Sequence, residues 1–257
     1  MTDALDRRSD RPAYRQIADQ LRSDIDDGDL QPGSKVPSER SLMERYGAAR
    51  GTVRQALAEL RTEGLIEVHH GKGAFVRARA PIHRLAHDRF ARRHREEGRA
   101  AFLAEMEAEG RAATVEVDYV GAEQAPEWVA TALGLDAREE VLVRRRRYLD
   151  AGEPIEIATS YLPLEIAAGT AIAEENTGPG GIYARLEDLG HRLEQFTEDV
   201  SARMPHPDEA RALELAAGVP VVRVVRHAIS ADGKVLELCD TIKAADRYIL
   251  SYALPAS

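Results

Sequence analysis

Four polar side chains at the start of one predicted helix have the chemistry needed to bind a polyanion. They are Arg50, Thr52, Arg54 and Gln55. At about 100° per residue, the two arginines lie within about 40° of each other, beside the apolar stripe that faces the core. A guanidinium group donates paired hydrogen bonds to a phosphate or a guanine edge, and hydroxyl and amide groups complete such contacts. The pattern predicts a nucleic-acid-binding helix, although a solvated surface helix can carry the same arginines.

A second candidate site is a run of four arginines, Arg144 to Arg147, in a predicted strand. Alternation along a strand sends Arg144 and Arg146 to one face of the sheet and Arg145 and Arg147 to the other. A guanidinium group on a covered face is costly to bury alone, so an inward pair implies either internal carboxylates or a bound anion. The alternative is an exposed edge strand whose arginines form salt bridges.

The sequence shows no comparable pattern for catalysis or metal binding. The C-terminal half offers no convincing nucleophile and base, no metal triad and no paired carboxylates. His83 and His87 have helical spacing but lack a third ligand, and the lone Cys239 cannot form an internal disulfide. We expect no catalytic residues, no metal and no cofactor.

Composition predicts two domains and no membrane segment. The chain has 257 residues, 44% of them hydrophobic, which is enough for two cores. No apolar run approaches the roughly 20 residues that cross a bilayer, and the charged N-terminus is unlike a signal peptide. We therefore expect a cytoplasmic protein with no membrane partner.

Charge is distributed unevenly along the chain. Residues 1–33, 34–99 and 100–257 carry formal charges of −3, +7 and −13, which account for the net charge of −9. A basic segment inside an acidic chain is expected if a phosphate-binding module is fused to a different domain. A solvated basic face would have the same composition.

The basic segment and the residues before it predict three helices and a hairpin. Apolar residues recur at helical spacing from Tyr14 to Asp27, and again in a helix that Ser38 caps and Gly47 closes. A third helix begins near Arg50 and ends at Gly64. Residues 65–68 and 74–77 alternate as two strands around His70-Gly71-Lys72-Gly73.

These motifs resemble the GntR family of bacterial transcription regulators. The matching motifs are Tyr14-x-Gln16-Ile17, Gly28-Asp29-Leu30-x-Pro32-Gly33, Pro37-Ser38-Glu39-Arg40, Arg50-Gly51-Thr52-Val53-Arg54-Gln55-Ala56-Leu57, Gly64-Leu65-Ile66 and Gly71-Lys72-Gly73-x-Phe75-Val76. The resemblance implies a winged helix-turn-helix over residues 10–77. Its implied DNA-binding residues are Ser38, Glu39, Arg40, Arg50, Thr52, Arg54, Gln55, His70, Gly71, Lys72 and Gly73.

One departure from the family pattern lies just before the third helix. The family usually has Val-Ser there, where this chain has Ala48-Ala49. The missing hydroxyl removes an N-cap worth about 1 kcal/mol, which weakens either the helix or its phosphate contacts.

The rest of the chain is predicted to be a basic linker followed by an α+β domain. Residues 78–99 contain seven arginines and few large apolar residues, so they read as a linker that connects the domains or helps to hold DNA. In residues 100–257, strand patterns are expected near 115–119, 140–149, 155–162, 221–229 and 235–242, and helices over 181–189 and 207–217. An antiparallel sheet with helices packed on it follows from this order.

The C-terminal half resembles the UTRA domain that marks the HutC subfamily of GntR regulators. The resemblance rests on VLVRRRRYLDAGEPIEIATSYLP, IYARLEDLGHRL, EDVSARMPHPDEARALEL and GVPVVRVVRHAISADGKVLELCDTIKAADRY. It implies a chorismate-lyase-like fold, a small-molecule effector between sheet and helices, and a homodimer.

The UTRA resemblance also implies which residues hold the effector: Arg144, Arg146, Ser160, Tyr161 and Glu237. Ile242-Lys243 replaces an aromatic residue that some members place in the pocket, which argues against an amino-sugar phosphate. Arg223 and Arg226 fit either the pocket or surface ion pairs.

Together the resemblances imply a ligand-responsive regulator, most often a repressor in this family. A homodimer would bind a palindromic DNA operator and be released by a small anionic metabolite such as a phosphorylated sugar or an organic acid. Two alternatives remain open: a lyase-like enzyme with a DNA-localising domain, and an architectural DNA-binding protein without an effector.

Overall fold

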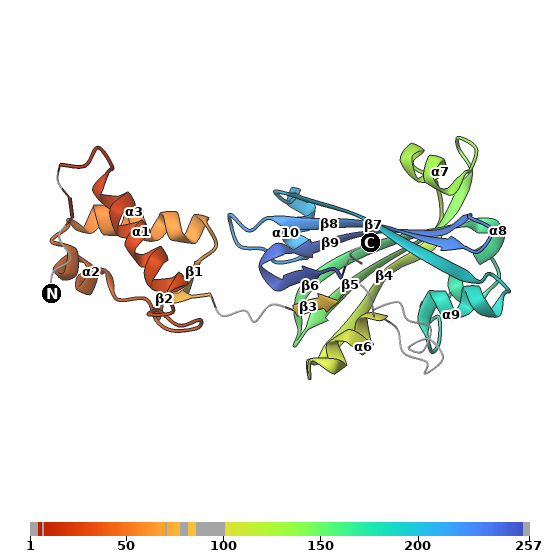
Figure 1. The fold of residues 1–257 in the computed structure, drawn as a ribbon, viewed down its shortest axis with the longest axis horizontal. Coiled ribbons are helices and arrows are strands. Elements are labelled where there is room, and N and C mark those ends of the chain that lie inside the picture. Colours follow the sequence, from red (N-terminus) through yellow and green to blue (C-terminus); the bar gives the residue numbers. More distant parts are fainter. Residues whose placement is uncertain (1–4, 7, 70, 78–81, 86–100, 254–257) are drawn as a thin grey trace. The chain divides into compact units, whose positions relative to one another are not determined.

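The computed structural model describes residues 5–6, 8–69, 71–77, 82–85 and 101–253. The chain divides into two compact units (Figure 1). One consists of Met1–Ala80 with Leu215–Val219, and the other of Pro81–Glu214 with Pro220–Ser257. Within the described residues, no helix is both long enough and apolar enough to cross a membrane.

The first unit is a bundle of three helices with a two-stranded hairpin. Its elements are α1 (Ala13–Asp26), α2 (Glu39–Tyr46), α3 (Arg50–Thr62), β1 (Ile66–His69) and β2 (Gly73–Val76). Ile17, Leu21, Leu42, Val53 and Leu60 are fully buried in one core, as the helical spacing predicts. The predicted caps are also confirmed: Ser38 Oγ accepts the backbone N–H of Ser41, and Gly47 ends α2 with a left-handed φ of 60°.

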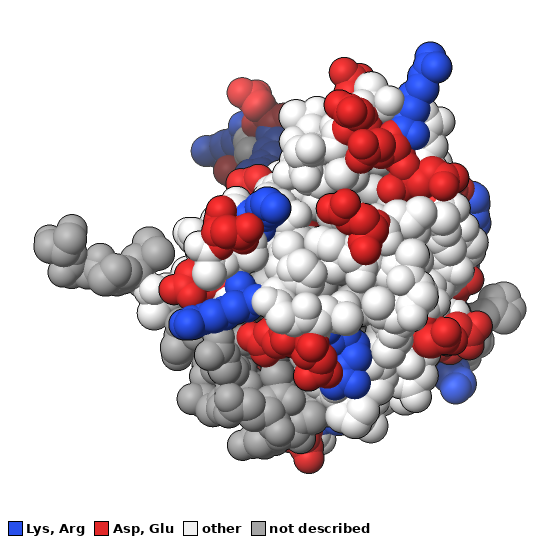
Figure 2. All heavy atoms as spheres, turned by 90° about the vertical axis from the view of Figure 1, so that its right-hand side faces the viewer, with Lys and Arg blue, Asp and Glu red and all other residues white. Residues whose placement is uncertain are grey.

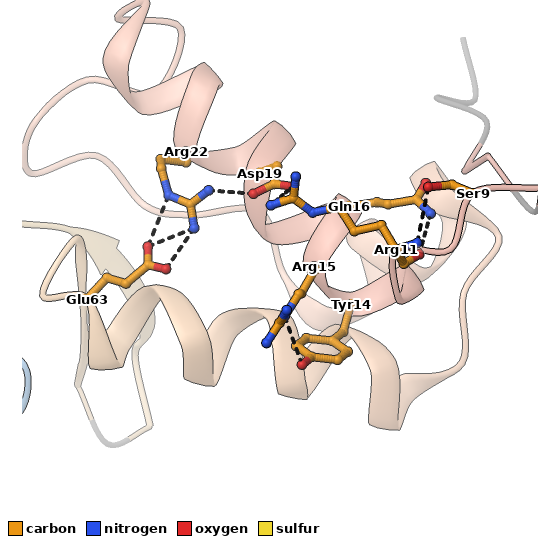
Figure 3. Close-up of polar contacts among 8 residues, drawn as sticks. All are labelled: Ser9, Arg11, Tyr14, Arg15, Gln16, Asp19, Arg22 and Glu63. Carbon is orange, nitrogen blue, oxygen red and sulfur yellow. Dashed lines mark hydrogen bonds and ion pairs between the residues drawn. The ribbon is translucent and has the colours of Figure 1, made fainter.

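Two side chains of α1 hold the segments around it. Gln16 Nε2 donates to the carbonyl oxygen of Arg11 at 2.8 Å, which fixes the residues before the helix. Arg22 donates to Asp19 on its own helix and to Glu63 just after α3 (Figure 3). The hydrogen bond to Glu63 raises the pKa of Arg22 above its ordinary value. An ion pair therefore joins the ends of α1 and α3 in addition to their shared core.

The second unit is built on a six-stranded antiparallel sheet. Its strands are β4 (Ala113–Gln124), β5 (Glu140–Asp150), β6 (Glu153–Pro163), β7 (Leu193–Arg203), β8 (Val221–Ser230) and β9 (Val235–Ala244). Their spatial order is β4-β5-β6-β9-β8-β7, and a separate parallel pair is formed by β3 (Ile82–Leu85) and β10 (Tyr248–Ser251). The predicted α+β class is confirmed.

Helices and the parallel strand pair cover one face of this sheet (Figure 1). One group packs over one part of that face and consists of α8 (Leu164–Ala167), the 3-10 helix η1 (Ala171–Ala173) and α9 (Gly181–Asp188). Another consists of α6 (Ala101–Ala108), β3 and β10. The opposite face carries α7 (Glu127–Leu133), while α10 (Pro207–Ala212) follows β7 and η2 (Ala245–Arg247) precedes β10.

The strand register fixes which side chains share the covered face. Arg144 of β5 is opposite Ser160 of β6, which is opposite Cys239 of β9, which is opposite Arg226 of β8. Every second residue along these strands lies on the same face. The covered face therefore collects the side chains from which a site between sheet and helices can be built.

The predicted linker over 78–99 needs correction where it is described. Residues 82–85 form β3, and Arg84, one of its seven arginines, is 2% exposed. A four-residue strand gives little periodicity, and its partner β10 lies far along the chain. The remaining residues of this range lie outside the described part.

Three further differences concern a strand that was not predicted, the face on which one residue lies, and the end of one helix. The edge strand β7 was not predicted, because charged residues interrupt its alternation. A bulge after Val117 places Tyr119 opposite Arg145, so it does not share a face with Val115 and Val117. The helix predicted over 207–217 ends at Ala212.

A buried ion pair lies on the covered face near the β3–β10 pair. Lys243 Nζ donates to Glu156, which also accepts a hydrogen bond from the hydroxyl of Tyr248 at 3.0 Å. The side chains of Lys243 and Glu156 are 1% and 3% exposed. A charge at this depth is tolerated only while its counter-charge is present.

We expect Lys243→Met to lower the free energy of unfolding of this unit by about 3 kcal/mol, because Glu156 would be left buried without its cation. The double variant Lys243→Met/Glu156→Leu should recover most of the loss. Urea denaturation followed by fluorescence of Trp128, the only tryptophan, measures this unit, since Trp128 lies in α7. Lys234→Met, at a lysine whose side chain is 77% exposed, is the control and should change little. Equal losses in Lys243→Met and in the control Lys234→Met would contradict the role assigned to the buried pair.

Candidate functional site

The arginines predicted to contact DNA lie near the N-terminal ends of α2 and α3. The side chains of Arg40, Arg50 and Arg54 are 89%, 71% and 69% exposed. Glu39 accepts from Arg50 Nε at 2.7 Å and lies 3.9 Å from Arg54 Nε. One carboxylate thus contacts two of the arginines.

The start of α3 presents further polar groups beside these arginines. Gln55 is exposed and Thr52 is half-buried. Ala49 supplies no side-chain cap to α3, as the sequence predicts. The N–H groups of an uncapped helix start are available to a phosphate oxygen, which the helix dipole also favours.

The hairpin tip is a tight turn built on two glycines. Gly71 and Gly73 have φ values of 75° and 111°, and a Cβ on Gly73 would lie 2.9 Å from Cε of Lys35. Lys72 is exposed between them. His70 lies outside the described residues. The tip therefore presents an exposed cation on a narrow backbone.

The second unit contains a cavity of about 260 Å³ on the covered face of its sheet. Strands β4, β5, β8 and β9 form its floor, and α6, α9 and the loop before α9 form its walls. The charged residues that line it are Arg144, Arg146, Arg226, Glu175 and Glu237. The predicted inward pair of β5 arginines does lie beside this cavity.

Arg144 donates hydrogen bonds to η1 and to the loop that walls the cavity. Its Nη1 donates to the carbonyl oxygen of Ile172 at 2.6 Å and to that of Glu174, and its Nη2 to that of Glu175 at 2.9 Å. Burial, followed by repulsion from Arg146, lowers the pKa of Arg144 to about 10. Arg144 therefore fixes the shape of the cavity, and most of its donors are already used.

Arg146 and Glu237 keep unused hydrogen-bonding capacity. Arg146 Nη2 donates to Ser160 Oγ, while its Nε has no partner among the described residues. Glu237 is 2% exposed, and its Oε2 likewise accepts no hydrogen bond there. Buried polar atoms without partners are uncommon in folded proteins, and here they lie on a cavity.

The sequence left open whether Arg223 and Arg226 belong to the pocket or to surface ion pairs. Arg226 lines the cavity, and its Nε donates to the hydroxyl oxygen of Tyr183 at 2.9 Å. Burial raises the pKa of Tyr183 well above its ordinary value, so this hydroxyl stays protonated at neutral pH. Arg223 lies on the opposite face, where it donates to both carboxylate oxygens of Asp240 at 2.9 and 3.0 Å.

Tyr161 does not reach the cavity. It follows Ser160 in β6, so alternation places it on the opposite face, where its ring lies 5.8 Å from that of Trp128. Its assignment to the effector site is corrected on this ground. Ser160 is fully buried on the cavity side and acts through Arg146.

The arginine run is divided between the two faces of the sheet. Arg145 donates to Glu123, and Arg147 to Glu116, on the side away from the cavity. These pairs match the predicted salt bridges, although β5 is an interior strand and not an edge.

The loop before α9 was not recognised as part of a site. Asn176, Thr177, Gly178 and Gly180 line the cavity, and Gly180 has a left-handed φ of 78° directly before α9. The N-terminus of α9 therefore faces the cavity with backbone N–H groups that suit an anion. The cluster of polar residues and glycines before a helical pattern was the available signal. In the part of the chain described here, no three His, Cys, Asp or Glu residues are arranged to hold a metal.

Comparison with known proteins agrees with this arrangement. Residues 13–76 match the model of the gntR family of bacterial regulatory proteins, and residues 108–249 match the UTRA domain. The chain is 35% identical over 247 residues to an uncharacterized HTH-type transcriptional regulator of Streptomyces coelicolor, covering 94% of this chain and 92% of that protein.

Two further relatives match over the full length. The HTH-type transcriptional repressor NagR of Bacillus subtilis is 28% identical over 246 residues, covering 95% of both chains. A crystal structure of a GntR-family transcriptional regulator superposes with a TM-score of 0.65 at 28% identity, covering 96% of this chain and 99% of that one. The predicted family is thus confirmed: this chain belongs to the GntR family of transcriptional regulators, in the HutC-type group that joins a winged helix-turn-helix to an effector-binding UTRA domain.

Proposed function

We propose that this regulator is a repressor that a small anionic metabolite releases from a two-fold symmetric DNA operator. The observation that carries the proposal is the cavity residue Arg146, a half-buried cation whose Nε is buried and has no acceptor in the described part of the chain. A carboxylate or phosphate oxygen would supply that acceptor and offset the cost of burying the charge.

The cavity also constrains the rest of the ligand. Oε2 of Glu237 is buried and accepts nothing among the described residues, so a ligand hydroxyl or N–H suits it. At about 260 Å³ the cavity lies at the small end of ligand sites. A metabolite with an anionic group at one end and a hydrogen-bond donor at the other fits these features.

The DNA contacts are proposed to come from α3 and the hairpin tip. Arg50 and Arg54 are exposed at the start of α3, where a major groove would reach them, and Lys72 is placed to contact phosphate or the minor groove. A homodimer would present two such helices to half-sites about one helical turn apart. DNA phosphates would displace Glu39 from the two arginines.

Repression and a cytoplasmic location are part of this proposal. NagR is named a repressor, and the relatives that match are regulators. The enzyme alternative gains no support from the cavity, whose described charged groups suit binding of an anion more than transfer of an atom. Turnover of a bound metabolite by the purified protein would overturn this assignment.

Arg54→Ala should weaken binding to a duplex selected from a random DNA pool by about 1 to 3 kcal/mol and reduce discrimination against mismatched bases, because one base-reading guanidinium is lost. Fluorescence anisotropy at fixed salt concentration measures both effects. Arg192→Ala removes the same charge from an exposed position of the second unit and serves as the control. The assignment of α3 fails if the two variants bind DNA alike.

Arg146→Met should abolish the thermal stabilisation that an anionic ligand gives to the full chain, since occupancy raises stability by RT ln(1 + [L]/Kd). The probes are inorganic phosphate and a panel of sugar phosphates and organic acids. Arg145→Met is a matched control, because Arg145 is the neighbouring arginine on the opposite face. An unchanged ligand response in Arg146→Met would place the anion site elsewhere.

A further inference from the structure

Glu198 of β7 connects the cavity to the β3 strand through two arginines. Its Oε1 lies 3.7 Å from Arg226 Nη1 and accepts a hydrogen bond from Arg84 Nη2. The three side chains are nearly buried, with 9%, 10% and 2% exposure for Glu198, Arg226 and Arg84. A single carboxylate is thus shared between a cavity cation and a β3 cation.

The contacts that Glu198 makes with the two arginines differ in kind. Arg84 is hydrogen-bonded to it, whereas 3.7 Å between nitrogen and oxygen exceeds the usual hydrogen-bond range. Arg226 is instead hydrogen-bonded to Tyr183, on the cavity side. The Arg226 contact is therefore the one that an added charge in the cavity would change.

The β3 strand lies where the chain passes from the first unit into the second. It is the first described segment of the second unit, and only residues 78–81 separate it from Arg77, where the described N-terminal stretch of the first unit ends. Its backbone pairs with β10, and the Arg84 side chain attaches it to β7. Whatever changes the attachment of β3 acts where the chain enters the effector domain.

From this geometry we infer that Glu198 couples occupancy of the cavity to the attachment of β3. The inference rests on the proposed function, because it requires an anion in the cavity. An anion there attracts Arg226, draws it away from Glu198, and leaves the carboxylate to Arg84 and to the hydroxyl of Tyr252, which donates at 3.3 Å. Arg84 then holds β3 more strongly. Because coupling is reciprocal, the attachment of β3 also alters affinity for the anion.

The first test measures anion affinity in the full chain, with inorganic phosphate or the tightest-binding member of the sugar-phosphate and organic-acid panel as the probe. Glu198→Gln should tighten binding by roughly tenfold, because Arg226 is no longer shared. Arg84→Met should weaken binding, because the uncompensated carboxylate then competes for Arg226. Glu116→Gln, which removes a carboxylate from the opposite face, is the charge-matched control and should leave affinity unchanged.

A double-variant cycle distinguishes a relay from long-range electrostatics. If Glu198 transmits the effect, Arg84→Met should not alter anion affinity when Glu198→Gln is already present. Additive effects of the two substitutions would overturn the inference. Arg84→Lys keeps the charge and should restore part of the coupling, while Trp128 fluorescence verifies that each variant is folded.

The second test measures DNA release. The anion should lower affinity for the selected duplex in the natural sequence and have a much smaller effect in Glu198→Gln, although that variant binds the anion more tightly. An equal effect in both would overturn the inference and leave the proposed function standing. If the natural protein binds no anion, or if Arg146→Met binds it normally, the proposed function fails and the inference with it.

Discussion

The cost of burying a guanidinium group is the constraint on which the effector domain depends. Four consecutive arginines occupy an interior strand, so strand alternation forces Arg144 and Arg146 under the helices. Each must be neutralised or hydrogen-bonded there. Arg144 meets this requirement with carbonyl groups of η1 and of the loop between η1 and α9, and that loop in turn walls the cavity. Arg146 meets it only in part, through Ser160, and its Nε has no acceptor among the described residues.

On the opposite face of the sheet, the other two arginines of the run form exposed ion pairs. Arg145 and Arg147 pair with glutamates that are 36% and 48% exposed. Exposed pairs of this kind contribute little to stability. Acidic side chains are also spread over the face of this unit shown in Figure 2, in keeping with the charge of −13 over residues 100–257. An acidic surface disfavours contact with DNA phosphates.

The sequence was sufficient where a local pattern determines the structure. Apolar periodicity, Ser38 and Gly47 define the helices of the first unit, and the repeated alternation of β5, β6, β8 and β9 defines most of the sheet. It was insufficient where contacts are distant in sequence. The β3–β10 pairing joins residues more than half the chain apart, and the role of Arg226 depends on Tyr183 and Glu198. Ser160 and Tyr161 are neighbours in one strand and therefore lie on opposite faces, so the predicted pair cannot both line one cavity.

The two units share an arrangement of charged side chains that the sequence alone does not show. In each, a carboxylate holds a pair of arginines: Glu39 with Arg50 and Arg54, and Glu198 with Arg84 and Arg226. Under the proposed function, an incoming phosphate or carboxylate would exchange with that internal carboxylate, so part of the Coulomb attraction would be offset and the net affinity reduced. The exchange favours ligands whose geometry satisfies the arginines better than the internal carboxylate does. It thereby turns a general attraction between opposite charges into discrimination among anions, which both halves of a ligand-responsive regulator require.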